Sequence, residues 1–400
     1  MNSIQLRRRN YRKKELIIGI IACCSFLAAW LIGASQSAAN IDPHLLEVIP
    51  DTSHIDKVGE DIFAAYSSDF PQRLLGYITT AKGNGYGGPM KVAVGVDLNG
   101  QILGLEIIEQ NETTSYMEEV LDTDFIQSLT GKYFTDEFRL FKDVDGITGA
   151  TYTCRGIAIA VLKGSRQIAE DQLNLAAPEL DEPEIKFGIP EITLIALFAT
   201  GYIGHRKKFK YKKLARWVSM LTGMVVLGFI YTQPLTLADI NKILLGFWPA
   251  WQTHLYWYLL IGGILFVFTA DNKNPYCEWF CPFGAAQECL AVIGEARNIS
   301  PGRYRSTLHW IQRGLAWLAI FLAILYRNPS FTSYEVFGSL FDFIGSTWQF
   351  ALLGIILIAS LFIKRPWCNY LCPIRPVMDL YRTFRKWIIE TWKKTKRKSA

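Results

Sequence analysis

Long apolar runs alternate with polar and charged segments along this chain of 400 residues. Six of the runs approach the roughly 20 residues that a helix needs to cross a bilayer. They cover residues 16–35, 187–204, 215–232, 248–270, 308–326 and 347–363. The second run is the weakest, because it is short and contains Glu191 near its start. The pattern predicts a multi-pass α-helical membrane protein with about six spans.

A different pattern fills the stretch between the first two runs. Residues 91–108 (KVAVGVDLNGQILGLEII) alternate between apolar and polar side chains on both sides of Asn99-Gly100, which predicts a β-hairpin with a type I′ turn. Residues 152–171 place apolar side chains at helical spacing. We therefore expect an inserted α+β domain over residues 40–171, followed by an acidic, proline-containing linker at 172–186.

Charge separates the same two parts. Residues 36–188 carry 25 acidic and 11 basic side chains, whereas the rest of the chain carries 11 acidic and 31 basic ones. The basic residues gather before the first run and in the segments 205–216, 271–307 and 364–400. By the positive-inside rule these segments are cytoplasmic and the α+β domain is extracytoplasmic. The basic tail, residues 386–400, is expected to lie on an anionic membrane surface rather than to bind nucleic acid.

The N-terminal segment, residues 1–39, reads either as a membrane anchor or as a cleaved signal segment. Both readings deliver the α+β domain to the same side of the membrane. Cys23 and Cys24 lie within its apolar run, and we expect two buried thiols rather than a lipoprotein attachment site.

Residues 143–153 (DVDGITGATYT) place two hydroxyls around a Gly-Ala pair just before the predicted helix. Thr151 would lie at the helix N-terminus, where backbone N–H groups and the helix dipole favour a phosphate. An ordinary threonine N-cap explains the position equally well.

A repeat marks the C-terminal half, expected as a five-helix domain over residues 187–385. PYCEWFCP (275–282) and PWCNYLCP (366–373) each follow an apolar run on the cytoplasmic side. Cysteines four residues apart share one face of a helical turn, so two motifs offer four thiols. Such a set suits an iron–sulfur cluster, a zinc ion or structural thiol cluster, or reversible dithiol chemistry. These four candidate ligands are Cys277, Cys281, Cys368 and Cys372.

Basic residues flank this repeat, and we expect Lys364, Arg365 and Arg375 to offset the charge of four thiolates. Other potential metal ligands are scattered. Cys154 and Cys289 are expected to be buried structural residues. The histidines at positions 205, 254 and 309 form no facing pair for haem.

Part of the chain resembles the flavin-binding domain of NosR/NirI-type membrane flavoproteins. The resemblance is carried by the residues GYGGPMKVAVGVDLNGQILGLEIIEQNET followed by DGITGAT. The same residues are also similar to flavin subunits of Rnf and sodium-pumping quinone oxidoreductases. The resemblance implies FMN joined by a phosphoester to Thr151. It further implies that Asp145 is needed by the flavin transferase that makes this link, and that Gly149 and Ala150 leave room for that reaction. The remaining residues implied to belong to the flavin site are Thr148, Tyr86, Gly87, Glu112 and Thr113.

The same family, including members associated with organohalide respiration, contains the two C-x₃-C-P motifs after the flavin domain. The resemblance therefore covers residues 58–385 and implies a bacterial inner-membrane protein. Longer members continue into a ferredoxin domain, so this chain resembles a short form without one. A quinone or a cytoplasmic donor would then supply electrons, and an extracytoplasmic redox partner would receive them.

The function expected from these observations is that of an electron-transfer subunit rather than a stand-alone enzyme. Because the hydrocarbon core is about 30 Å thick, electrons would need a quinone, a moving flavin domain or cofactors of a partner to cross it. The alternatives are a redox sensor or maturation protein without sustained turnover, and a scaffold whose cysteines hold zinc.

Overall fold

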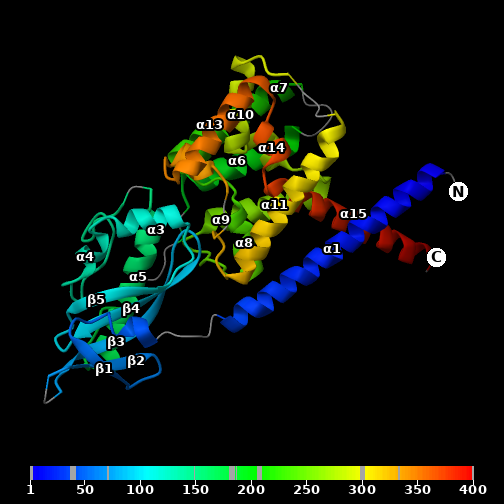
Figure 1. Cartoon of the computed structure of the whole chain (residues 1–400). Helices are drawn as coiled ribbons and strands as arrows, with labels where there is room; N and C mark the ends of the chain where they lie inside the picture. Colours follow the sequence, from blue (N-terminus) through cyan, green and yellow to red (C-terminus); the bar gives the residue numbers. More distant parts are fainter. Residues whose placement is uncertain are drawn as a thin grey trace.

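The structure is a computed structural model that describes residues 3–36, 42–69, 72–147, 149–179, 185, 187–204, 210–297, 302–331 and 334–398. Thr148 and His205 lie outside these residues. The chain forms a sheet domain, at the lower left of Figure 1, and a larger helical part that lies beside it.

The sheet domain is built on five antiparallel strands in sequential order. Alternating apolar side chains cover both faces of this sheet. One face packs against α5 (Thr151–Asp171), and the other packs against a short segment that includes Leu45, Val48 and Ile49. The strands are β1 (Thr52–Lys57), β2 (Ile62–Ser67), β3 (Leu74–Asn84), β4 (Pro89–Asp97) and β5 (Ile102–Glu109). The short helices α2 (Asp42–Leu45), α3 (Thr114–Leu121) and α4 (Phe125–Leu129) complete the domain. The α+β prediction for this region is confirmed.

The hairpin expected at Asn99-Gly100 joins β4 to β5, but its turn is not type I′. A type I′ turn needs positive φ at both central residues, and only Gly100 has it, at 89°. The Asp97 carboxylate instead accepts hydrogen bonds from the backbone N–H groups of Asn99 (2.8 Å) and Gln101 (2.7 Å). The aspartate therefore selects a three-residue loop that ends in a left-handed glycine.

The helical part consists of apolar helices joined by short polar segments. They are α6 (Ile189–Gly204), α7 (Lys212–Thr222), the π-helix η1 (Gly223–Ile230), α8 (Leu237–Leu245), α9 (Leu255–Asp271), η2 (Tyr276–Phe280), α10 (Pro282–Ile293), η3 (Gly302–Tyr304), α11 (Arg305–Leu325), α12 (Phe337–Phe341), α13 (Thr347–Phe362), α14 (Pro366–Tyr370) and α15 (Ile374–Lys398).

Three apolar helical stretches are long enough to cross a membrane: Ile17–Ser35, Lys212–Ile230 and Gly302–Leu325. Three shorter apolar helices, α6, α9 and α13, cover the other predicted spans. A helix of 16 residues is only about 24 Å long, less than the ~30 Å hydrocarbon core. The three long helices indicate a membrane protein, and the count of six spans stays a prediction.

The N-terminal helix α1 (Ser3–Gln36) lies along α11, which the buried side chain of Ala29 contacts. Trp317 of α11 donates a hydrogen bond to Ser25. Cys23 and Cys24 are exposed on α1, so the expectation of two buried thiols is wrong. Over residues 17–35 most side chains of α1 are exposed, which leaves them available to lipid.

The C-terminal helix α15 also packs against α11. Beyond this contact it exposes Leu380, Phe384, Trp387 and Ile388, whose spacing places them on one helix face. The two termini point toward the same side of the molecule, away from the sheet domain (Figure 1).

Candidate functional site

Thr151 is the first residue of α5, and its side chain is half-buried. Its hydroxyl donates to the backbone carbonyl of Ile147, with an oxygen–oxygen distance of 3.2 Å. The N-cap is Ala150, so an ordinary threonine N-cap does not explain this position. The hydroxyl instead lies in the first turn, where the dipole and the N–H groups of the helix favour a phosphate.

The backbone of the residues just before Thr151 is closely constrained. Gly149 has φ of 94°, a left-handed conformation that favours glycine. A Cβ at this position would also collide with the side chain of Ile344 in the helical part. Ala150 is buried, whereas Asp145 is exposed and therefore accessible to another protein.

Glu112 connects three segments of the sheet domain. Its side chain is 1% exposed, and it accepts hydrogen bonds from the Gly87 N–H (3.0 Å) and the Thr153 hydroxyl (3.0 Å). Burial raises the pKa of Glu112 to about 6. This carboxylate thus ties the Gly-rich turn and the end of β5 to the first turn of α5. Sequence reasoning missed Thr153, which has the helical spacing of an ordinary core residue.

The glycines of the 83–89 turn make room for this carboxylate. A Cβ on Gly85 would collide with the Glu112 carboxylate, and one on Gly87 would collide with the Asn111 carbonyl. The same turn also lines the cavity between the sheet domain and the helical part through Gly85 and Gly88. Thr113 is the N-cap of α3 without a side-chain capping bond, and lies with Tyr86 beside a cavity of about 40 Å³.

Three tyrosines lie where the sheet domain meets the helical part. The ring centroids of Tyr86 and Tyr116 are 5.6 Å apart, and those of Tyr86 and Tyr152 are 6.4 Å apart. The Tyr116 hydroxyl donates to Asp342 (2.9 Å), and Gln233 donates to the Tyr152 hydroxyl (2.8 Å). Aromatic faces beside Thr151 suit the ring system of a flavin, so the residues present fit FMN.

The four cysteines of the repeat are half-buried and line one cavity of about 260 Å³. Both motifs close with the same hydrogen bond. The N–H of Cys281 donates to the Tyr276 carbonyl (2.7 Å), and that of Cys372 donates to the Trp367 carbonyl (2.9 Å). The two motifs share this hydrogen bond, although the first forms the π-helix η2 and the second the α-helix α14.

Within the described part of the chain, no three histidine, cysteine or carboxylate side chains lie close enough together to hold a single metal ion. Four thiolates around one zinc at about 2.3 Å would lie roughly 3.8 Å apart. The four cysteines instead surround a space, which fits a cluster of several ions better than zinc. Burial and the neighbouring thiols raise the pKa of Cys277, and burial raises that of Cys281 to about 11. Because the raised pKa values disfavour thiolates, these cysteines are expected to lose their protons only when bound cations stabilise the thiolate charge.

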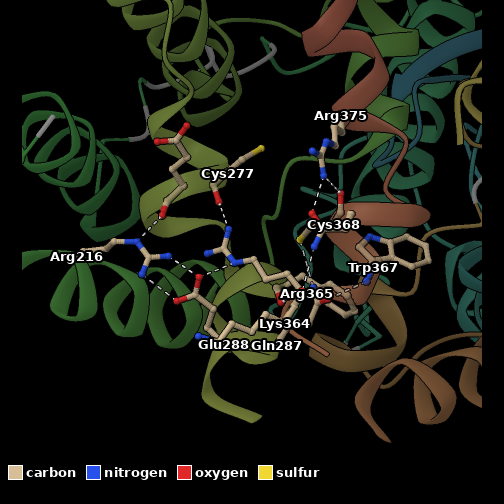
Figure 2. A network of polar contacts seen from close by, with 12 residues as sticks. Arg216, Cys277, Gln287, Glu288, Lys364, Arg365, Trp367, Cys368 and Arg375 are labelled. Carbon is tan, nitrogen blue, oxygen red and sulfur yellow. Dashed lines mark hydrogen bonds and ion pairs between the residues drawn. The ribbon is translucent and has the colours of Figure 1, made fainter. Parts of the chain in front are cut away.

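Polar groups from four segments surround the thiols (Figure 2). Arg365 donates to the Cys277 carbonyl (2.7 Å), and Arg375 donates to the Cys368 carbonyl (3.3 Å). Both arginines line the cavity, as expected from the basic flanks, whereas Lys364 does not. Arg365 also forms an ion pair with Glu288 (2.7 Å).

Side-chain amides contact two of the sulfurs directly. Gln287 donates to Cys368 Sγ (3.3 Å), and Asn274 donates to Cys277 Sγ (3.2 Å). Gln287 also accepts from the Trp367 N–H (3.0 Å), which ties α10 to the second motif. Sequence reasoning missed Gln287, Asn274 and Arg216, which pairs with Glu288 (2.9 Å). Of these three, only Asn274 lies close in sequence to a cysteine motif, three residues before Cys277, so only its position could have been noticed from the sequence.

The segments 233–247 and 327–346 carry one basic residue each and are therefore expected on the extracytoplasmic side, yet both reach this cavity. Leu235, from the 233–247 segment, and Phe337, from the 327–346 segment, both line it. The N–H of Leu235 donates to the Tyr276 hydroxyl (2.7 Å). The cysteines and the sheet domain are therefore separated by a short loop rather than by a full row of helices.

Among the described residues, Cys154, Cys289, His254 and His309 do not line the thiol cavity. Cys154 is buried as expected, whereas Cys289 is half-buried. His254 lines a cavity beside Tyr152, with the two ring centroids 6.1 Å apart.

Two family models match separate parts of the chain. An FMN-binding domain matches residues 85–164, and a 4Fe-4S binding domain matches residues 253–300 and 347–391. The first contains the Gly-rich turn, Glu112 and Thr151. The second contains the four cysteines, so the chain carries a 4Fe-4S binding domain, and the description of a short form without a ferredoxin domain is contradicted only in part.

The chain is similar to several characterised proteins. It is 27% identical to Protein NirI of Paracoccus denitrificans over 39% of this chain and 25% of NirI. It is 23% identical to Regulatory protein NosR of Pseudomonas aeruginosa over 48% of this chain and 29% of NosR. It is 29% identical to a component of the ion-translocating oxidoreductase complex of Vibrio vulnificus over 38% of this chain and 85% of that component. The matches thus span less than a third of NirI and of NosR.

These matches and the three long apolar helices support a membrane electron-transfer flavoprotein with flavin and iron–sulfur cofactors.

Proposed function

We propose that the protein passes electrons to an extracytoplasmic redox partner through FMN attached by a phosphoester to Thr151. A flavin transferase makes this bond, with Asp145 exposed toward it. Cys277, Cys281, Cys368 and Cys372 hold an iron–sulfur cluster. The flavin supplies one- and two-electron chemistry, and the cluster supplies one-electron chemistry.

The observation that carries this proposal is the loop between η1 and α8. Gln233 donates to Tyr152, the neighbour of Thr151, and two residues later Leu235 donates to Tyr276, the neighbour of Cys277. The Gln233 carbonyl also accepts from the Tyr256 hydroxyl (3.0 Å), which holds the loop on α9. One fixed loop thus separates the two cofactor sites, and its hydrogen bonds maintain their separation without a moving domain.

The residues around each site position the side chains that would hold the flavin or the iron–sulfur cluster. Glu112 fixes the Gly-rich turn against α5, so that the Thr151 hydroxyl is presented from a rigid helix end. Arg365 and Arg375 lie beside the thiols and offset thiolate charge, while Gln287 and Asn274 donate to sulfur. Hydrogen bonds to ligand sulfur raise the reduction potential of such a centre.

The directions of the two termini support the topology proposed from charge, whereas the contact of Leu235 with the cysteine cavity does not. The N-terminal end of α1 and the C-terminal end of α15 both point away from the sheet domain (Figure 1). With basic termini in the cytoplasm of a bacterial cell, the sheet domain lies outside the inner membrane.

The test is the cofactor content of full-length protein, co-expressed with a flavin transferase and purified anaerobically in detergent. We expect one covalent FMN per chain together with iron and acid-labile sulfide. Thr151→Ala should lose all in-gel flavin fluorescence after denaturation, and Thr151→Ser should retain it because the hydroxyl remains. Zinc in place of iron, or flavin retained in Thr151→Ala, would contradict the proposal.

A regulatory role is the second candidate, because the chain is similar to a protein named as regulatory. Rapid reoxidation of the reduced flavin by an extracytoplasmic partner supports the conduit. Partner binding that depends on redox state without net electron flow supports the sensor.

A further inference from the structure

A cavity of about 720 Å³ lies between the sheet domain and the helical part. Gly85, Tyr86 and Tyr152 line it from the sheet domain, and Lys242 is one of the residues that line it from the helical part. Its volume is within the range of sites that hold small organic molecules. Because Tyr152 follows Thr151 directly, the cavity adjoins the residue to which we assign FMN.

Lys242 brings a buried cation to this cavity. It lies in the last turn of α8 and is 8% exposed. Among the described residues its one ion pair is with Asp239, at 3.5 Å, and its ammonium lies 5.1 Å from the centre of the Tyr86 ring. An ammonium carries three N–H donors, and a buried charge needs close partners. The lysine can therefore donate to a further group within the cavity.

The charged groups of the lining differ in how they are satisfied. Asp239 accepts hydrogen bonds from the N–H and the hydroxyl of Thr236, at 2.9 Å each. Glu191 accepts from the Gly188 N–H (2.8 Å). Protein donors thus hold both carboxylates, whereas Lys242, the one lysine or arginine among the described lining residues, has donors to offer. The cavity suits a ligand with acceptor atoms.

Aromatic side chains supply much of the remaining surface. Tyr86, Tyr152 and Trp257 line the cavity from both parts of the chain. A flavin is a flat aromatic ring system with carbonyl and ring-nitrogen acceptors along its polar edge, so aromatic faces and one ammonium match its two kinds of surface. A charge beside such a ring also tunes its electronic properties.

The cavity also borders the cysteine site. Pro234 lines it, and the next residue, Leu235, lines the cavity of the four cysteines. A ring held here would be separated from that site by one short loop.

We propose that this cavity holds the ring of FMN and that Lys242 is the cation that stabilises the negative charge of the reduced ring. This inference rests on the proposed function, because it assigns a site to the ring of the flavin attached at Thr151. A flavin ring that takes up two electrons and one proton gains one negative charge. In the proposed function the iron–sulfur cluster supplies the electrons, one at a time, and water supplies the proton. The helical part thus completes a flavin site that the sheet domain begins.

The experiment measures the flavin midpoint potential of full-length, FMN-loaded protein in detergent by spectroelectrochemical titration. Lys242→Met keeps an unbranched apolar side chain and removes the charge. The reduced ring should be stabilised about tenfold less relative to the oxidised ring, which for a two-electron couple lowers the potential by about 30 mV. The absorption bands of the oxidised flavin should also shift, because a charge beside the ring alters its electronic transitions.

Two further variants separate charge from packing. Lys242→Arg keeps the charge and should keep the wild-type potential. Lys163→Met is the matched control, at an exposed position on α5 about 18 Å further along the helix than Thr151, and should leave the potential unchanged. Equal shifts in Lys242→Met and Lys242→Arg would overturn the proposal, because only the first removes the charge.

Covalent flavin content, measured by in-gel fluorescence after denaturation, separates this proposal from the one on which it depends. Lys242→Met should retain the wild-type amount, since attachment uses Thr151. Full flavin content with an unchanged potential in Lys242→Met overturns the assignment of Lys242 and leaves the proposed function intact. Wild-type protein without covalent flavin overturns the proposed function, and this inference with it.

Discussion

The two cofactor sites are built in opposite ways. Around Thr151 the main elements are local: Asp145, Gly149 and Thr151 lie within seven residues, and backbone geometry positions the hydroxyl. The cysteine site joins two motifs about ninety residues apart, and side chains from further helices complete it. The first site depends on a helix end, the second on the packing of many helices.

The electrostatics of the two sites differ as well. Near Thr151 the buried ionisable group is Glu112, which neutral hydrogen-bond donors hold. Near the thiols Arg365 and Arg375 offset the negative charge expected there, although Glu278, Asp379 and Arg382 also line the cavity. We therefore expect that a substitution at one site can remove its cofactor while the other site keeps its own.

Cys368→Ser should remove essentially all iron and sulfide while covalent flavin at Thr151 is retained. A cluster that loses one of four thiolates loses a ligand that serine replaces poorly. Metal analysis and in-gel flavin fluorescence of one preparation measure both. Cys289→Ser, at a half-buried position outside the cavity, is the control that should keep its iron. Joint loss of iron and flavin would show that the sites depend on each other.

Glu112→Gln should change the pH dependence of the sheet domain's stability. In the folded protein burial raises the pKa of Glu112 from 4.5 to about 6, so the folded state binds the proton more tightly than the unfolded state. Stability from this group is full below pH 4.5 and falls by about 2 kcal/mol as pH rises through 6.

Thermal unfolding of wild type and Glu112→Gln between pH 4.5 and 7 measures this difference. The amide keeps an acceptor for the Gly87 N–H, so the variant should lose the pH-dependent part alone. Parallel curves for the two proteins would rule out titration of Glu112 in this range.

Gln287→Leu should lower the reduction potential of the cluster by about 40 mV, because one hydrogen bond to sulfur contributes roughly 1 kcal/mol. A redox titration followed by electron paramagnetic resonance measures it. Gln312→Leu is the matched control, since this buried glutamine donates to the Cys372 carbonyl rather than to a sulfur. An equal shift in both variants would point to a general packing effect.

Tyr152→Phe should loosen the loop between the two sites by less than about 1 kcal/mol, because it removes one hydrogen bond to Gln233. Amide exchange in residues 231–236 should become up to about fivefold faster. Tyr116→Phe, which removes a bond to Asp342, should affect residues 338–342 instead. Unchanged exchange in Tyr152→Phe would show that this bond does not hold the loop.

The sheet domain was largely predictable because its signals are local. Alternation in residues 91–108 predicted the hairpin, and apolar spacing predicted the helix that begins at Thr151. The turn type was wrong because the Asp97 side chain, rather than the Asn-Gly pair, decides the loop. The contact of Gly85 with Glu112 was not predictable, since Glu112 comes from the end of a different strand.

The sequence by itself determined the types of chemistry present: four paired thiols, a threonine at a helix start, apolar helices and segregated charge. These depend on residue identity and on spacing along one element. Only the tertiary structure decided that Gln287 and Asn274 contact sulfur and that Leu235 reaches the cysteine cavity. It also decided that Tyr152 of the sheet domain and Trp257 of the helical part line one cavity. Such contacts depend on how helices distant in sequence pack, which spacing along the chain does not encode.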